Sequence, residues 1–483
     1  MSYKSTTYLK LFCILALFSS VVYGEQPKTN RLAENGVFIQ IPGPNPILKP
    51  GPRGSWDDNI LEASDAYEEY GTYYIYYHGS KGAYYGDSGV GEGKGYQIGV
   101  ASSSHPLGPF KKPTNKPVLE IGPEGSWEDR DLACAMILKD GNKKYLMFYF
   151  GRRRGRDGMG LATASHPLGP WTKYEGNPII EDFGYTGGVV KVDDTYYLYS
   201  EYPISMRKPD YGPMAVATAK KPEGPWTKYE GNPVMDVGQW GEWDGGGISE
   251  AEVLYNNGVF HMFYGGTPMF DPSIGIEEGR AWQARDEDIG YAYSFDGFKW
   301  FKYGMNPVVT RHDCPNISSF SEVHTVMKAP FIYLYNTQRY KKVDGIDYPW
   351  IEHLGVQVLV TQRPFQLDMP LLSVNALAAG RTTPLADVPP VSLSHIRRLA
   401  ITAQCTYSKN ASGGLRLHVV SSPDGIIYDT LDYLTVNVKA LPGQQVRKTF
   451  VVDPAVRFIK VLAENMDASE PLADLKITAT LGG

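Results

Sequence analysis

The sequence contains a repeated element that restricts its fold more than any other feature. Residues 168–180 read LGPWTKYEGNPII, and residues 223–235 read EGPWTKYEGNPVM. Weaker copies begin at Leu107, Asp296 and Gln362, so five copies follow one another at intervals of roughly 55–70 residues. A period of this length indicates a fold that builds one supersecondary unit several times.

Each copy of the element closes a unit with the same internal order. A small-residue or acidic segment comes first, then an aromatic segment, then a segment of small residues such as IGVASS or MAVATA, and then the repeated element. Four short strands bounded by turn residues form one propeller blade. The sequence therefore predicts an all-β fold with a five-bladed β-propeller over residues 36–372, in which the repeated element is the outermost strand of each blade. The aromatic segments are YYIYYHG from Tyr73, YLMFYFG from Tyr145, YYLYSE from Tyr196, FHMFYGG from Phe260 and FIYLYN from Phe331.

The two ends of the chain differ from the repeats. Residues 1–24 contain two lysines and then the apolar run LFCILALFSSVV, which is typical of a cleaved signal peptide, so we expect a secreted or periplasmic protein without a membrane span. Residues 373–390 are rich in proline and small residues and predict a linker. Residues 391–483 predict a second all-β domain, a β-sandwich whose segments resemble a discoidin-type jelly roll.

The charge of the chain excludes one class of partner. The formal net charge is −6 at pH 7. A nucleic-acid-binding domain usually carries a basic patch, so we expect no nucleic-acid partner. The oligomeric state stays open at this stage.

The register of the units points to candidate catalytic residues. The first strand of each propeller blade lines the central channel, so residues at a fixed distance before each aromatic segment are expected to face it. These positions hold Glu62, Glu250 and Glu322 in blades one, four and five, whereas blade two has Ala133 or Cys134. Crowded carboxyl groups have pKa values that separate, which suits one to act as general acid and another as base. Carboxylates that bond only to strand-end amides are the structural alternative.

With these features the chain resembles the five-bladed propeller glycoside hydrolases of families 43 and 32, with the related families 117 and 130. The segment ISEAEVLYNNG is similar to the general-acid segment of family 43, which implies Glu250 as the acid, although Glu252 stands where the family has proline. The resemblance also implies a carboxylate base in blade one, where Glu62 aligns and Asp58 lies close by.

Two further roles follow from the same resemblance. The pair Arg130-Asp131 is similar to an Arg-Asp pair of family 32, which implies that Asp131 tunes the acid and that Arg130 contacts substrate. The segment SEVHTV resembles the arabinanase segment that places a histidine on the propeller axis near a cation, which implies His324 as an axial ligand, with Ca²⁺ as the expected ion. A histidine acid, as in family 117, and a core-packing histidine are alternatives for His324. No cofactor is expected to be required.

Residues of the channel mouth suggest how a substrate would bind. The segment GRRRGRDG carries Arg154 among four arginines, and guanidinium groups suit carboxylate, sulfate or phosphate, which favours an anionic glycan. A solvated or salt-bridged loop is the alternative. Trp282 lies in a long loop and could stack on a sugar ring, and Glu322 could bind sugar hydroxyls.

Together these features predict a secreted glycoside hydrolase that cleaves a plant or algal polysaccharide or oligosaccharide through two carboxyl groups. A glycoside phosphorylase of the same fold and a non-catalytic glycan-binding propeller are the alternatives. Turnover that depends on phosphate would separate the first alternative, and binding without turnover would separate the second.

Overall fold

A computed structural model of the 483-residue chain provides the coordinates. The structure describes residues 29–35, 38–81, 95–153, 156–183, 187–201, 213–239, 241–268, 287–314, 316–340 and 352–483. The expected signal peptide lies outside these residues. No helix in the described part of the chain is long and apolar enough to cross a membrane.

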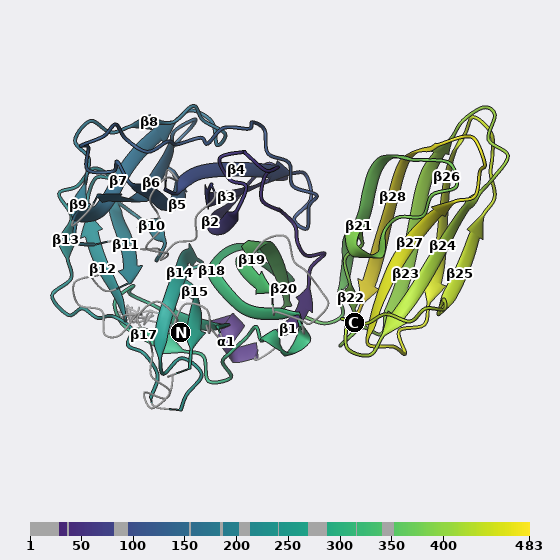
Figure 1. The fold of residues 1–483 in the computed structure, drawn as a ribbon. Helices are drawn as coiled ribbons and strands as arrows, with labels where there is room; N and C mark the ends of the chain where they lie inside the picture. Colours follow the sequence, from purple (N-terminus) through teal and green to yellow (C-terminus); the bar gives the residue numbers. More distant parts are fainter. Residues whose placement is uncertain are drawn as a thin grey trace, which may run out of the picture.

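Five antiparallel sheets surround a central axis and form the blades of a propeller, with β2, β5, β10, β14 and β18 nearest the axis (Figure 1). Blade one contains β2 (Ile60–Glu69), β3 (Thr72–Ser80) and β4 (Gln97–Ser103); blade two contains β5 (Asp131–Lys139), β6 (Tyr145–Arg153), β7 (Arg156–Ala164) and β8 (Thr172–Lys173), with β9 (Ile180–Glu181) paired to β7. Blade three contains β10 (Val189–Val192), β11 (Thr195–Glu201), β12 (Met214–Ala219) and β13 (Thr227–Lys228). Blade four contains β14 (Gly247–Asn256), β15 (Val259–Thr267), β16 (Asp288–Ser294) and β17 (Trp300–Lys302), and blade five contains β18 (Ile317–Lys328), β19 (Phe331–Tyr340), β20 (Glu352–Val360) and β1 (Ile39–Pro42).

The remaining strands form a β-sandwich beside the propeller (Figure 1). One sheet has the order β21 (Gln366–Leu377), β28 (Leu472–Gly482), β23 (Arg398–Tyr407) and β26 (Gln445–Val452). The other has the order β22 (Val391–Ser392), β27 (Phe458–Asn465), β24 (Leu415–Ser422) and β25 (Leu434–Val438). The short helical elements are α1 (Arg31–Asn35), η4 (Arg311–Asp313) and η5 (Leu385–Asp387). The predicted fold class, a propeller followed by a β-sandwich, is confirmed.

The aromatic segments form the second strand of each blade because both of their faces are buried. Successive side chains of a strand point to opposite faces. Tyr76 belongs with Tyr149 to the apolar cluster between blades one and two, whereas Tyr77 belongs with Tyr335 to the cluster that reaches blade five. A strand buried on both faces needs apolar or aromatic residues at every position, which explains the continuous run YYIYYHG.

The repeated element closes blades two, three and four as expected. Its asparagine side chain acts as an additional backbone unit for the neighbouring strand. Asn177 Oδ1 accepts a hydrogen bond from Leu161 N at 2.8 Å, and Asn177 Nδ2 donates to Leu161 O at 3.0 Å. Asn232 makes the same two bonds with Val216. These residues therefore serve the fold and not the chemistry.

Blade five departs from the expectation, because its outermost strand comes from the N-terminal part of the chain. Strand β1 pairs with β20, with Ile39 opposite Val360. The turn after β1 reads GPNP, and Asn45 Oδ1 accepts a hydrogen bond from Val356 N at 2.7 Å. In blade five, this turn replaces the repeated element. The assignment of the copy from Gln362 to the outermost strand was wrong.

The expected domain boundary at residues 372 and 373 was also wrong. Most of the copy from Gln362 itself lies in β21, which pairs with β28 along its length, from Gln366 with Gly482 to Leu377 with Leu472. The β-sandwich therefore begins at Gln366, and residues 373–377 of the expected linker belong to one of its strands.

Candidate functional site

A group of buried charged side chains gathers at one end of the propeller channel. The inner strands begin there, and because neighbouring strands are antiparallel, the second strands end there. We call this group the funnel cluster. It consists of Glu62, His78, Glu201, Glu250, Glu287, Glu322, Arg339 and Glu352, which are linked by hydrogen bonds or by electrostatic interactions. Three of its members, Glu62, Glu250 and Glu322, were predicted from the sequence register.

Backbone irregularities turn the glutamates of blades four and five toward the channel. Glu250 lies in a β-bulge between Ser249 and Ala251 of β14. Glu322 lies in a wider bulge of β18 with a φ of 44°. Bulges re-aim a side chain and are common beside active sites. In β2, by contrast, Glu62 stays in the regular register opposite His78.

Glu62 is held as an anion by His78. Oε2 of Glu62 lies 2.7 Å from Nε2 of His78, and Nδ1 of His78 lies 2.8 Å from Ser64 Oγ. The backbone N–H of Cys134 points to the same Nδ1 from 3.5 Å, which favours Nε2 as the ring nitrogen that donates to Glu62. Burial is the largest single influence on the pKa of Glu62 and acts to raise it, but the hydrogen bond and charge of His78, together with smaller effects of Glu352 and Arg339, lower that pKa to about 2.

The pKa of Glu250 is shifted in the opposite direction. Burial, followed by repulsion from Glu322, raises the pKa of Glu250 well above its ordinary value. The two carboxyl groups hydrogen-bond to each other, and Glu250 is the donor because it retains its proton. Glu322 also accepts a hydrogen bond from Ser321 Oγ at 2.8 Å. Oε2 of Glu250 is buried and has no hydrogen-bond partner among the described residues.

Arg339 brings a guanidinium group into the funnel cluster. Its Nε pairs with Oε1 of Glu352. Burial and then the charge of Glu62 raise the pKa of Glu322, and the charge of Arg339 opposes this rise. The same guanidinium is one of the smaller influences that lower the pKa of Glu62. The cluster contains six glutamates, so one guanidinium leaves its floor acidic.

Blade two contributes an ion pair at the same end of the channel. Asp131, the first residue of β5, accepts a hydrogen bond from Arg152 Nε at 2.9 Å and one from Tyr96 N at 3.2 Å. Arg130 Nε lies 3.6 Å from Asp131, and the Arg130 side chain is 43% exposed. These contacts make Asp131 the counter-ion of two arginines, and no described contact links it to Glu250.

The structure does not bring Asp58 into the funnel cluster. Its carboxylate accepts a hydrogen bond from Gly54 N at 2.6 Å in an exposed turn, as Asp129 does from Gly125 N at 2.7 Å. The contact repeats between blades and shapes a turn, so Asp58 is no longer a candidate base. Arg154 and Trp282 lie outside the described residues.

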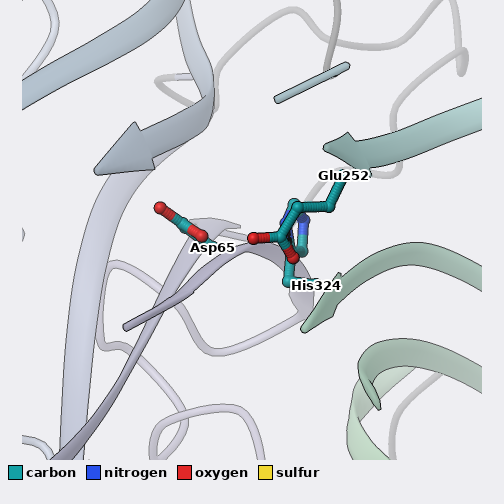
Figure 2. Close-up of side chains that lie close together, drawn as sticks. All are labelled: Asp65, Glu252 and His324. Atoms are coloured by element: carbon teal, nitrogen blue, oxygen red, sulfur yellow. Dashed lines mark ion pairs between the residues drawn. The ribbon is translucent and has the colours of Figure 1, made fainter. Parts of the chain in front are cut away.

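A second buried group lies further along the same channel. Asp65, Glu252 and His324 come from the inner strands of blades one, four and five, and their ligand atoms all lie within 4.8 Å of one another (Figure 2). Burial raises the pKa of Asp65 to about 7, and burial and then the charge of Asp65 raise that of Glu252. Burial and then the charge of His78 lower the pKa of His324 to about 3, so the ring is neutral.

Several members of the funnel cluster were missed by the sequence argument. It considered only the inner strands, whereas His78, Glu201 and Arg339 lie at the ends of second strands and Glu352 begins a third strand. The sequence did contain a signal for these residues. The aromatic segments YYIYYHG and YYLYSE carry near their ends the polar residues His78 and Glu201, which an entirely buried strand does not require. Cross-strand pairing would have placed His78 opposite Glu62.

Comparison with known proteins adds distant structural neighbours. No family model and no curated protein matches the chain. Similar solved structures include a glycosyl hydrolase from Bacteroides ovatus (14% identity, 65% of this chain and 91% of that chain, TM-score 0.47) and a β-1,2-mannobiose phosphorylase from Listeria innocua (12%, 66% and 96%, TM-score 0.47). A thermostable family-43 glycoside hydrolase has 16% identity over 64% of this chain and 91% of that chain, with a TM-score of 0.43. Similarity at this distance does not assign a function, which must be argued from the site.

Proposed function

We propose that the protein is a glycoside hydrolase in which Glu250 is the general acid and Glu62 is the general base or nucleophile. The observation that carries the proposal is the opposite protonation of two carboxyl groups in one cluster. The pKa of Glu250 lies well above its ordinary value, and that of Glu62 lies at about 2. Glycosidases need one carboxylic acid and one carboxylate on the two sides of the cleaved bond.

The two residues would act in sequence on the glycosidic bond. Glu250 donates its proton to the leaving oxygen, and the hydrogen bond to Glu322 holds the acid in place before the transfer. Glu62 then removes a proton from the attacking water, or attacks the anomeric carbon directly. His78 and Ser64 orient Glu62. All proton transfers are assigned to side chains, so the proposal requires no cofactor.

The acidic floor of the funnel favours an uncharged sugar at the cleaved bond. Glu201 and Glu287 both act to raise the pKa of Glu250, so they lie near the bond that Glu250 would protonate. A carboxylate or sulfate there would be repelled. An anionic group of the kind that the arginine-rich segment favours would bind away from these glutamates. We further propose secretion, on the basis of the N-terminal apolar segment.

The test compares the parent protein with Glu250→Gln and Glu62→Gln on a panel of neutral and acidic oligosaccharides, followed by proton NMR with and without phosphate. Each substitution is expected to lower the rate by about 10²–10⁴-fold. The matched control is Asp58→Asn, which removes a nearby carboxylate outside the cluster and should leave the rate unchanged. Binding of oligosaccharides without any turnover would overturn the proposal, and turnover only with phosphate would make the protein a phosphorylase.

A further inference from the structure

The group formed by Asp65, Glu252 and His324 has the composition of a metal site. We propose that these three residues hold a divalent transition-metal ion of the zinc or manganese type. The family resemblance implies only a histidine and Ca²⁺ on the axis. Glu252 occupies a position where family 43 has proline, and Asp65 was not predicted at all, so both carboxylates are features of this chain.

The geometry of the three side chains suits a small cation. Nδ1 of His324 lies 3.8 Å from Oε2 of Glu252. Two ligand atoms that each lie about 2.1 Å from one metal ion are about 3–4 Å apart, so this pair needs little movement to bind. In Figure 2 one oxygen of Asp65 faces the carboxyl group of Glu252, so Asp65 supplies the third ligand atom of the site.

The ligands are oriented by contacts outside the site, as metal ligands usually are. Asp65 Oδ1 accepts a hydrogen bond from Ala66 N at 2.7 Å, and its Oδ2 accepts one from Ile137 N of blade two. Oε2 of Glu252 accepts a hydrogen bond from Thr325 N. Each oxygen has a second lone pair, so these bonds fix the carboxylates and still leave capacity for an ion.

One observation indicates that the site is incomplete without a ligand. None of the ion pairs of the described residues joins Asp65 or Glu252 to a lysine or arginine, and the one ion-pair partner of Glu252 among these residues is the imidazole of His324. Two buried carboxyl groups without a cationic neighbour are costly, and a divalent ion would offset that cost.

An entry path leads to the site from the end of the channel opposite the funnel cluster. A cavity of about 240 Å³ is lined by Asp65, Glu252 and His324 at its inner end and by Lys191 and Tyr255 near the ends of their strands. An ion could therefore enter without passing the funnel cluster.

The donor set selects the class of metal. Calcium takes six to eight oxygen ligands, whereas imidazole nitrogen is a preferred ligand of zinc and its neighbours in the transition series. Carboxylates bind manganese and zinc as well. One imidazole and two carboxylates therefore favour Zn²⁺ or Mn²⁺ over Ca²⁺.

The experiment measures metal binding directly and does not depend on the proposed activity. The full chain is treated with a chelator and titrated with Zn²⁺, Mn²⁺ and Ca²⁺ in a calorimeter. We expect one equivalent of Zn²⁺ or Mn²⁺ to bind, with Ca²⁺ at least about tenfold weaker. Asp65→Asn and Glu252→Gln should each weaken binding by at least about tenfold, with near-UV circular dichroism as a check on folding.

The matched control is Asp432→Asn in the sandwich. Asp432 also pairs with an imidazole, since its Oδ2 lies 2.8 Å from His418 Nδ1, but this pair is on the surface. The substitution should leave the titration unchanged. A second readout that needs no variant is the pulsed electron paramagnetic resonance spectrum of bound Mn²⁺, which should show one directly bound nitrogen. Lack of binding, binding lost only in Asp432→Asn, or equal affinity for Ca²⁺ would overturn the proposal.

Discussion

Nε2 of His78 donates a hydrogen bond to Oε2 of Glu62 over 2.7 Å, and the two residues are direct partners across β2 and β3. The pairing matters because Glu62 is buried, and a buried carboxyl group without a donor would take up a proton. His78 is thus the main group that keeps the proposed base charged, with smaller contributions from Glu352 and Arg339.

Replacement of His78 by phenylalanine should raise the pKa of Glu62, because burial would then act without the opposing hydrogen bond. The base is active only when ionised, so activity should be lost at low pH and the acidic limb of kcat/KM should move upward by about two pH units or more. His78→Gln keeps an N–H donor and should therefore move the acidic limb upward by less than His78→Phe does. Ser64→Ala is the control and should move the limb little, because Cys134 N still faces Nδ1. An unchanged acidic limb in His78→Phe would exclude this role for His78.

Replacement of Glu322 by glutamine should lower the pKa of Glu250, because repulsion from Glu322 is the largest influence on that pKa after burial. The acid would then lose its proton at a lower pH, so the alkaline limb of the pH–rate profile should move downward while the acidic limb stays in place. Glu287→Gln removes a weaker influence and should give a smaller shift in the same direction. A larger shift in Glu287→Gln would contradict the assignment.

An ion pair between a lysine and a buried carboxylate stabilises blade four, and its loss should lower the free energy of unfolding measurably. Lys302 Nζ lies 2.7 Å from Oδ2 of Asp244, which is 2% exposed and also accepts a hydrogen bond from Tyr264. Lys302→Met leaves this buried carboxylate with one donor fewer and should lower the free energy of unfolding by about 1–3 kcal/mol. The matched control is Lys220→Met, whose pair with Asp194 is exposed and should contribute much less to the free energy of unfolding. Urea unfolding followed by tryptophan fluorescence compares the two, and equal losses would disprove the argument.

The position of β21 predicts where the sandwich can be separated from the propeller. A fragment of residues 363–483 contains all of β21 and should fold cooperatively. A fragment of residues 373–483 lacks Leu367 and Met369, which are 3% and 0% exposed, and leaves much of β28 without its partner. The shorter fragment should therefore aggregate, as uncovered strand edges do. Circular dichroism and light scattering measure both properties, and equal solubility would place the boundary where the sequence suggested.

The blades were predictable because their repeated residues have repeated contacts. Asn177 and Asn232 make the same backbone bonds in successive blades, so a short motif located their outer strands. Blade five was mispredicted because β1 comes from the other end of the propeller, and the order of residues along the chain does not reveal such closure.

The site was predictable only in part for a related physical reason. Register along one strand identified Glu62, Glu250 and Glu322, since the inner strands share a position relative to the channel. It gave no information on charges that reach the cluster from neighbouring strands, such as Arg339. It also missed the convergence of Asp65 on Glu252 and His324, which come from three different blades and meet only when the propeller closes.

The pairing of Ile39 with Val360 also sets an order of events during synthesis. Strand β1 leaves the ribosome before any other strand of the propeller, and its partner β20 leaves last. Until then β1 has no neighbour, and the hydrogen-bonding edge of β19 that β20 will cover is open. An incomplete chain that stops before Glu352 would expose both edges at once, and such edges associate readily with other chains. The same closure that joins the two ends of the propeller therefore makes the nascent chain dependent on protection until the whole propeller has been translated.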